Sequence, residues 1–518
     1  MRKICFIFVL LISSHAKLFA QQDSVRNIVQ QRQLYFSDSL SMISYSFAKL
    51  SPLFLSQLMP AQLSTISAGH QFEKGKFVNA QGSTQTNTVF LSSEGITDLK
   101  GIKLFGAFNY QKTMEDSTRF SHQTRNNPTT PYYFGSPANN HYERSTYDFK
   151  VIGAKTLSGN KITLGIGLDY RIADHFANND PRGSVKEYQL NMRGMLGYNV
   201  ADNVKFGLTY LVGYGQEKVT IGYKNRTYYE SISYPNYVNY LINGYGEPIP
   251  KTSERNYNDF QTRSGLATSF AAANTKLGSF YFIGTKVNEK QVYDYRTGSE
   301  ITDLSYYNLA KLDLNLLWIK PIFAGNLGVN IAYENLAGED FNLDFFAKNY
   351  VYTGQKINLQ VNYTITKNSS TYNYLIGAKQ TSEERIDGIT GNLVYFKNVL
   401  LNAGLGVNRK VANHKSFGAY AGVHYGLPVT EKLQVSEANE SYFTKEVIRY
   451  NYLFNTANRY GVSASATYSF PFFNTMQAAV KVNAVYSKND KMKNLQRPTT
   501  AIPGNERFFN NISFNLYF

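Results

Sequence analysis

Long runs of alternating apolar and polar residues constrain the fold of this 518-residue chain more than any other feature. In residues 161–172 every even position is Ile, Leu or Tyr, whereas the odd positions include Lys161, Asp169 and Arg171. Successive side chains of a strand point to opposite faces, so this pattern predicts a strand with one apolar and one polar face. The same alternation recurs at 204–214, 326–333, 357–365, 399–408, 417–425, 460–470 and 476–487.

The length of these runs distinguishes a membrane barrel from a soluble sheet. Soluble strands average about five or six residues, whereas a tilted strand that crosses a bilayer needs about 9–11. Many of the runs reach ~10–13 residues, which matches the second class. Open sheet edges are not tolerated in lipid, so such strands must close into a ring. We therefore predict an all-β, closed antiparallel transmembrane β-barrel over residues 62–518.

The joints between the runs alternate strictly between short and long, as periplasmic turns and external loops do in such barrels. The short joints are at 94–98, 157–160, 199–202, 272–275, 320–325, 366–370, 409–414 and 471–474. The long joints are at 113–144, 173–185, 216–259, 288–305, 336–353, 380–395, 428–459 and 488–506. With one more hairpin over 62–93, this parse gives about 18 strands, with 16 or 14 as alternatives.

The N-terminus has the layout of a secretory signal peptide over residues 1–20. Arg2 and Lys3 precede the apolar run 4–12, and Leu-Phe-Ala ends at Ala20, where we expect cleavage. We therefore expect export to the cell outer membrane. The only cysteine, Cys5, lies inside this signal, so the mature chain has no disulfide and no cysteine-ligated metal.

The C-terminus alternates in the same way as the other runs. Ile512, Phe514, Leu516 and Phe518 share one face. A last strand of this kind, ending in Phe, resembles the signal by which the barrel assembly machinery recognises its substrates. Phe514, Leu516 and Phe518 are therefore the predicted assembly signal.

Charge limits the partners that the chain can have. The full chain carries a formal charge of +16, and removal of residues 1–20 leaves 50 basic against 37 acidic residues, or +13. Export argues against nucleic acid, so the basic balance points to outer-membrane lipid, to lipopolysaccharide or to anionic solutes.

If the apolar face meets lipid, a set of charged residues lines the lumen. An open pore with this lining would prefer anions, whereas a filled barrel would use the same residues as ion pairs between strands. The candidate lumen residues are Lys103, Lys150, Lys161, Asp169, Arg171, Arg193, Lys205, Lys311, Asp313 and Lys481.

Residues 21–61 precede the first strand and contain a short predicted helix around residues 38–50. About forty residues suffice for a hatch inside the lumen or for a periplasmic contact. They are too few for the plug domain of an energy-coupled transporter, whose barrel also has about 22 strands.

Two predicted external loops have distinctive chemistry. Aromatic rings stack on ligands or partner surfaces, and arginines hold phosphate or carboxylate groups. Under the alternative interpretation, the rings mark the membrane boundary and Asp180-Pro181 only turns the chain. The candidate binding residues are Tyr132, Tyr133, Phe134, Tyr142, Arg144 and Arg182.

The same stretches carry a family resemblance. Residues 137–144, which end in Tyr-Glu-Arg, and the later Asn-Asp-Pro-Arg of residues 179–182 resemble an uncharacterised family of outer-membrane barrels in the Bacteroides group. That family has no established catalytic residues to carry over. The resemblance implies a possible TonB-dependent transporter as partner, because some members accompany such uptake systems.

Catalytic patterns are absent from the sequence. It holds no Gly-x-Ser-x-Gly and no His-Glu-x-x-His motif, and His424, with Ser416 and Tyr420 on its strand face, is the one histidine worth testing. We expect no enzyme activity, cofactor or metal. The predicted function is a passive channel or an accessory to nutrient uptake. The alternative is a filled barrel that binds a partner or a surface ligand through its loops.

Overall fold

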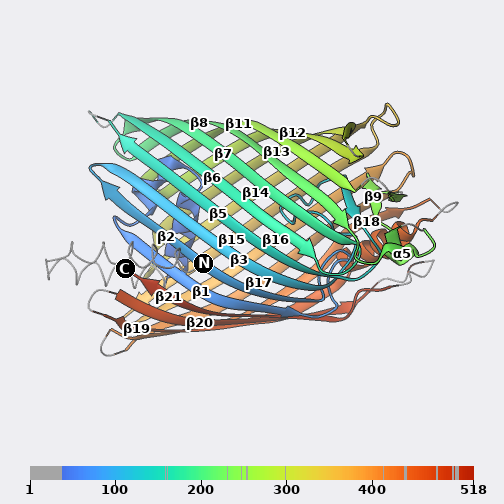
Figure 1. Cartoon of the computed structure of the whole chain (residues 1–518). Coiled ribbons are helices and arrows are strands. Elements are labelled where there is room, and N and C mark those ends of the chain that lie inside the picture. The colour runs from blue at the N-terminus through green and yellow to red at the C-terminus, as the bar shows by residue number, and fades with distance from the viewer. Residues whose placement is uncertain are drawn as a thin grey trace.

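The computed structural model describes residues 38–518 except 158, 160, 230–231, 247, 253–254, 298, 412–413, 437–439, 474–475, 493–494 and 496–500. The predicted signal peptide and residues 21–37 lie outside the described residues. Eighteen strands form one sheet in which each strand pairs with its neighbours along the chain and the last strand pairs with the first (Figure 1). The predicted closed barrel and its strand count are confirmed.

The barrel strands are long and antiparallel throughout. In chain order they are β1 (Leu63–Lys74), β2 (Gln85–Leu99), β3 (Ile102–Thr118), β5 (Asn140–Thr156), β6 (Ile162–Ala177), β7 (Arg182–Ala201), β8 (Val204–Gly222), β11 (Asn256–Thr275), β12 (Gly278–Thr297), β13 (Glu300–Ile322), β14 (Gly325–Asn342), β15 (Tyr350–Lys367), β16 (Ser370–Asp387), β17 (Leu393–Lys410), β18 (Ser416–Gln434), β19 (Asn458–Phe472), β20 (Met476–Lys491) and β21 (Glu506–Tyr517).

The outer face of the wall is apolar, as the alternation predicts. Along β6, Leu164 and Ile166 are exposed, whereas Thr163 between the flanking apolar residues is buried. A continuous apolar belt on the outside of a closed barrel is what a lipid bilayer requires. Among the described residues, no helix is long and apolar enough to cross a membrane.

Several of the predicted joints are wrong. β2 runs through 94–98 to a turn at Lys100 and Gly101, and β11 runs through 272–275 to a turn at 276–277. The strands on either side of the predicted loops 173–185 and 288–305 continue to tight turns. In these stretches the apolar–polar alternation fades although the hydrogen-bonded ladder continues. A strand that extends beyond the lipid has water on its outer side, so nothing there selects apolar residues.

The chain before the barrel forms three short helical pieces. They are α3 (Ser39–Ala48), the 3-10 turn η1 (Pro52–Phe54) and α4 (Leu55–Leu58), and α3 lies where a helix is predicted. The Asp38 carboxylate caps α3 by accepting hydrogen bonds from the amides of Leu40 (3.0 Å) and Ser41 (3.3 Å). Figure 1 shows these pieces, in blue, inside the barrel toward the end at which the C-terminus lies.

The opposite end of the barrel carries the remaining elements, which come from the long loops (Figure 1). A small three-stranded sheet consists of β4 (Tyr132–Gly135), β9 (Tyr240–Asn243) and β10 (Pro248–Pro250). The helical turns there are α5 (Arg226–Tyr229), η2 (Pro235–Tyr237), η3 (Thr444–Ile448) and α6 (Arg449–Asn455). We call this the external end, because the long loops lie there.

Candidate functional site

The charged residues predicted for the lumen lie on the inner face of their strands, with one exception. Lys150 pairs in register with Asp169, and Arg193 pairs in register with Gly167, on the face opposite to the exposed apolar residues. Lys161 instead lies in the exposed turn before β6, because that strand begins only at Ile162. The inner-face residues are Lys103, Lys150, Asp169, Arg171, Arg193, Lys205, Lys311, Asp313 and Lys481.

Most of these cations have an acidic neighbour on the wall. The Asp169 carboxylate contacts both Arg193 and Lys150, the latter at 3.1 Å. Lys311 Nζ lies 3.3 Å from Asp313 and 3.4 Å from Glu334. Neighbouring opposite charges reduce the field that a passing ion would meet, so the inner wall is not a ring of unpaired cations.

The N-terminal pieces fill part of the lumen at the end opposite the long loops (Figure 1). Leu53, Phe54 and Leu55 are fully buried or nearly so, and the Phe54 ring packs on Tyr281 with a centroid distance of 5.9 Å. The wall makes room for this segment with glycine: a Cβ at Gly165 would lie 2.6 Å from the Pro52 side chain.

The loop 119–139 fills the lumen at the external end. The Thr124 amide donates to Glu217 at 2.8 Å, and its hydroxyl contacts Glu187. Asn127 donates to Asp259 at 3.4 Å, so the loop is fixed to three strands of the inner wall. Each contact satisfies a buried polar group that would otherwise be costly to desolvate.

Five of the predicted binding residues are buried, either within this external filling or on the wall strand β5 beside it, and are not exposed to ligands. Tyr132, Tyr133, Phe134 and Tyr142 are 0–6% exposed, and the Tyr132 hydroxyl contacts Asp340 on the wall. The expectation that these rings stack on ligands or partner surfaces is therefore wrong. The physical reason is that large aromatic side chains are stabilised more by burial in the lumen than at its rim.

Arg144 is also a structural residue, since only 4% of it is exposed. Its Nε donates to the Glu115 carboxylate at 2.8 Å, and one Nη donates to the Gln123 carbonyl at 3.1 Å. Beside it, the Tyr142 hydroxyl contacts Nδ1 of His122. Burial, together with the positive charge of Arg144, lowers the pKa of His122 to about 3.

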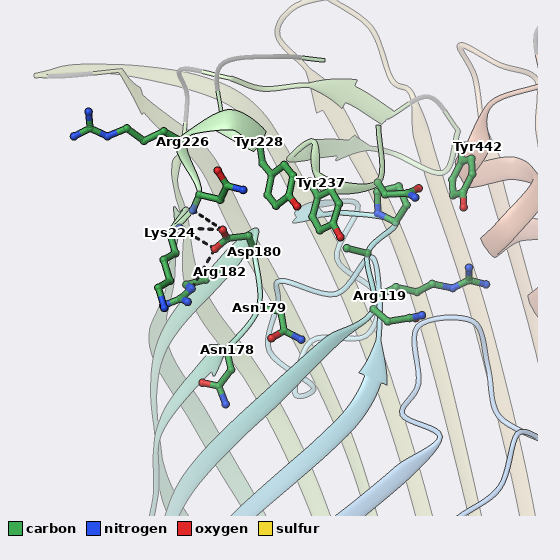
Figure 2. A pocket seen from close by; sticks show the side chains of 15 residues that line it. Arg119, Asn178, Asn179, Asp180, Arg182, Lys224, Arg226, Tyr228, Tyr237 and Tyr442 are labelled. Atoms are coloured by element: carbon green, nitrogen blue, oxygen red, sulfur yellow. Dashed lines mark hydrogen bonds and ion pairs between the residues drawn. The ribbon is translucent and has the colours of Figure 1, made fainter. Parts of the chain in front are cut away.

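A cavity with a volume of about 920 Å³ lies at the external surface. Figure 2 shows it between the β6–β7 turn, the β8–β11 loop and the β3–β5 loop. We call it the external pocket. Its lining residues are Arg119, Pro137, Ala138, Asn139, Asn178, Asn179, Asp180, Arg182, Lys224, Asn225, Arg226, Tyr228, Asn236, Tyr237 and Tyr442.

Asp180 holds one side of the external pocket together (Figure 2). Its carboxylate accepts hydrogen bonds from the backbone amides of Lys224 (2.9 Å) and Asn225 (2.8 Å) and from Arg182 Nε (3.1 Å). The backbone amide of Ala138 donates to the carbonyl of Asn236 at 2.9 Å, which joins the other two loops. Both sequence stretches singled out above therefore meet at this pocket.

Arg182 is the one predicted loop residue that is open to solvent, since 44% of its side chain is exposed. Tyr228, Tyr237 and Lys224 could not be predicted as pocket residues, because their loop has no periodic pattern. The many Tyr and Asn residues of this loop distinguish its composition. Composition does not show that the loop lies beside residues 178–182.

Comparison with known proteins identifies the family. A family model matches residues 52–518, which is nearly all of the described chain. The chain belongs to the DUF6850 family. DUF6850 is described as a family of unknown function, which agrees with the expected uncharacterised family. An origin in the Bacteroides group stays a prediction. No protein of curated function matches the chain in sequence.

Several solved barrels resemble this DUF6850 member at low similarity. The ferric yersiniabactin uptake receptor FyuA from Yersinia pestis is 8% identical over 88% of this chain and 80% of its own, with a TM-score of 0.41. The FrpB iron transporter from Neisseria meningitidis is 10% identical over 90% and 82%, with a TM-score of 0.37. CdiB from Acinetobacter baumannii is 8% identical with a TM-score of 0.36; the match covers 89% of this chain but 60% of CdiB. Similarity at this level carries no information on function.

Proposed function

We propose that this protein is a non-enzymatic barrel of the outer membrane that serves nutrient uptake as an accessory, by holding a solute at its external face. One observation carries the proposal: the lumen is filled from both ends, by residues 38–59 and by the loop 119–139, while the external pocket stays open. A filled barrel with an open outer pocket is suited to binding rather than to free diffusion.

Location and partner are parts of the same proposal. The apolar outer belt and the predicted signal peptide support the outer membrane, with its lipid and lipopolysaccharide as surroundings and the barrel assembly machinery as the route of insertion. A TonB-dependent transporter is the partner that the family resemblance implies. It would supply the transport step that a closed barrel does not.

An enzyme has less support. His424 Nε2 lies 3.1 Å from the Ser487 hydroxyl, and neither Ser416 nor Tyr420 is its hydrogen-bond partner among the described residues. Among the described residues, no carboxylate is hydrogen-bonded to His424, whereas a catalytic histidine is usually oriented by a carboxylate. Within the described ranges, no group of His, Cys, Asp and Glu could hold a metal ion.

Planar-bilayer recording tests the proposal. The full-length protein should insert and show no steady conductance. A variant that lacks residues 38–59 and carries a short Gly-Ser linker in place of 119–139 should conduct, because both fillings are removed. Its conductance shows that the recording detects inserted protein. Steady conductance of the full-length protein would refute the plugged lumen and favour a passive channel.

A gated conduit is the second candidate, and one observation favours it. The inward-facing side chains of Lys311 and Lys356 keep 40% and 49% of their surface exposed, so the lumen holds solvent beside its fillings. In the same recordings, conductance that appears only when periplasmic residues 38–59 are deleted would favour this candidate. A gated channel would then describe the protein better than an uptake accessory.

A further inference from the structure

The external pocket combines positive charge, free amides and paired tyrosine rings. We infer that it binds an acidic saccharide, a sugar chain that carries carboxylate groups. The inference rests on the proposed function, since it names the class of solute that the external face would hold. The same chemistry occurs in free uronic-acid oligosaccharides and in the acidic sugars of lipopolysaccharide.

The charge of the pocket is strongly unbalanced. Its lining contains Arg119, Arg182, Lys224 and Arg226 but a single carboxylate, Asp180. Arg119 is neutralised by Glu446, which lies 2.7 Å away outside the lining. Lys224 and Arg226 have no acidic partner within 4.0 Å among the described residues, and both are exposed.

The one acid, Asp180, does not pair with the side chains of Lys224 and Arg226. Asp180 accepts from two backbone amides and from Arg182, so its oxygens are occupied in holding the loop. Only 9% of its side chain is exposed. Arg182 is paired with Asp180, so Lys224 and Arg226 are the two lining cations that no carboxylate of the described residues offsets, and an anionic group would be attracted to them.

The aromatic rings of the pocket are packed against one another. The rings of Tyr228 and Tyr237 stack in parallel with a centroid distance of 4.0 Å and an angle of 3°, and Tyr234 packs edge-on against Tyr228 at 5.5 Å. The Tyr223 hydroxyl donates to the Tyr237 carbonyl at 2.9 Å, which fixes this turn from below. Flat rings packed against one another offer a surface to the C–H face of a pyranose at little cost in conformational entropy.

The amides complete the set that a saccharide needs. No side-chain hydrogen bond is found for Asn139, Asn179 or Asn236 in the described part of the chain, so each can both donate to and accept from hydroxyl groups. A bare phosphate would use the cations and leave the rings and amides unused. A neutral sugar would leave the cations uncompensated. A volume of about 920 Å³ accommodates a short oligosaccharide.

Isothermal titration calorimetry of the detergent-solubilised full chain tests the inference with two trisaccharides. Trigalacturonic acid should bind at least tenfold more tightly than maltotriose at low salt, and its affinity should fall as salt screens the charges. Lys224→Gln should weaken trigalacturonic acid at least fivefold and leave maltotriose unchanged. Tyr228→Ala should weaken both sugars.

Lys348→Gln is the matched control, since Lys348 is exposed at the external end but pairs with Glu339 at 2.7 Å, away from the pocket. It should bind like the wild type. Equal binding of the two sugars, stronger binding of adenosine monophosphate than of trigalacturonic acid, or equal loss in Lys348→Gln and Lys224→Gln would each overturn the inference.

A second arm identifies the source of the sugar. If lipopolysaccharide micelles bind with the same sensitivity to Lys224→Gln, and compete with trigalacturonic acid, the ligand class holds and membrane sugars are one source. If neither acidic ligand binds, the inference is wrong. The bilayer recordings are independent of this result. If the full-length protein does not conduct and does not bind acidic sugars, only the ligand class is refuted.

Discussion

At the scale of single residues, the same side-chain types serve two purposes in this protein. Arg144 and Arg182 are both arginines of predicted external loops, yet Arg144 is buried against Glu115 and Arg182 faces solvent beside Asp180. Sequence alone gives these two residues the same chemistry. The difference arises from which loop folds into the lumen and which stays at its rim.

His122 makes the external filling sensitive to acid. Its pKa is lowered from 6.5 to about 3 by burial and by Arg144, whereas the residue in an opened loop would titrate normally. The opened loop therefore binds a proton that the closed loop does not, and the closed loop loses stability as the pH falls below 6.5 toward 3. Hydrogen exchange of peptides from residues 119–131, corrected for intrinsic rates, should accelerate between pH 7.5 and pH 5.

His122→Gln should remove this pH dependence, because the amide does not titrate. His70→Gln, at an exposed position on β1, is the control and should behave like the wild type. Equal protection of the wild-type loop at both pH values would contradict the prediction.

At the scale of elements, the barrel contains segments that do not belong to its wall. The N-terminal pieces α3, η1 and α4 are too short to be stable helices alone, so their structure depends on burial. Phe54 is the centre of that burial: none of its surface is exposed, and it packs on Phe47 at 5.4 Å and on Tyr281.

Phe54→Ala should detach the N-terminal segment and leave the barrel intact. Removal of a fully buried phenylalanine costs about 3–5 kcal/mol, which exceeds what the remaining contacts of so short a segment can offset. Limited proteolysis should cleave within residues 38–59 several-fold faster, while the barrel keeps its folded mobility in unheated gels. Ser56→Ala, at an exposed position of α4, should leave the cleavage rate unchanged.

At the scale of the whole molecule, stability depends on closure of the ring. β21 pairs with β1 from Thr65–Tyr517 to Lys74–Phe508, and the backbones of Ser64 and Phe518 exchange two further hydrogen bonds of 2.8 and 3.0 Å. Closure leaves no open edge to be desolvated in lipid. Phe518 thus lies at the joint between the first and the last strand.

Phe518→Ser should lower the amount of assembled barrel several-fold. The substitution leaves the backbone pairing with Ser64 possible but removes the apolar terminal side chain that, with Phe514 and Leu516, forms the predicted assembly signal. The fraction with heat-modifiable mobility in outer-membrane extracts measures the effect. Asn511→Ser, on the inner face of the same strand, should assemble normally; equal losses in both variants would show that the strand as a whole, not its terminal signal, is affected.

The sequence by itself determined the wall of this protein. Lipid outside and a polar lumen inside act on every strand in the same way, so alternation, strand number and the outward face of Phe514 could be read residue by residue. The pattern stopped being informative where the strands leave the lipid, which is why the joints at 94–98, 173–185 and 288–305 were misplaced.

Only the tertiary structure decided what fills the barrel and where a ligand can bind. The external pocket joins Arg119, residues 137–139, residues 178–182, residues 224–237 and Tyr442. These segments are brought together by the closure of the ring and by loops that fold without a repeating pattern. Their contacts depend on complementary shapes and individual hydrogen bonds between distant residues, and such pairings leave no periodic signal in a single sequence.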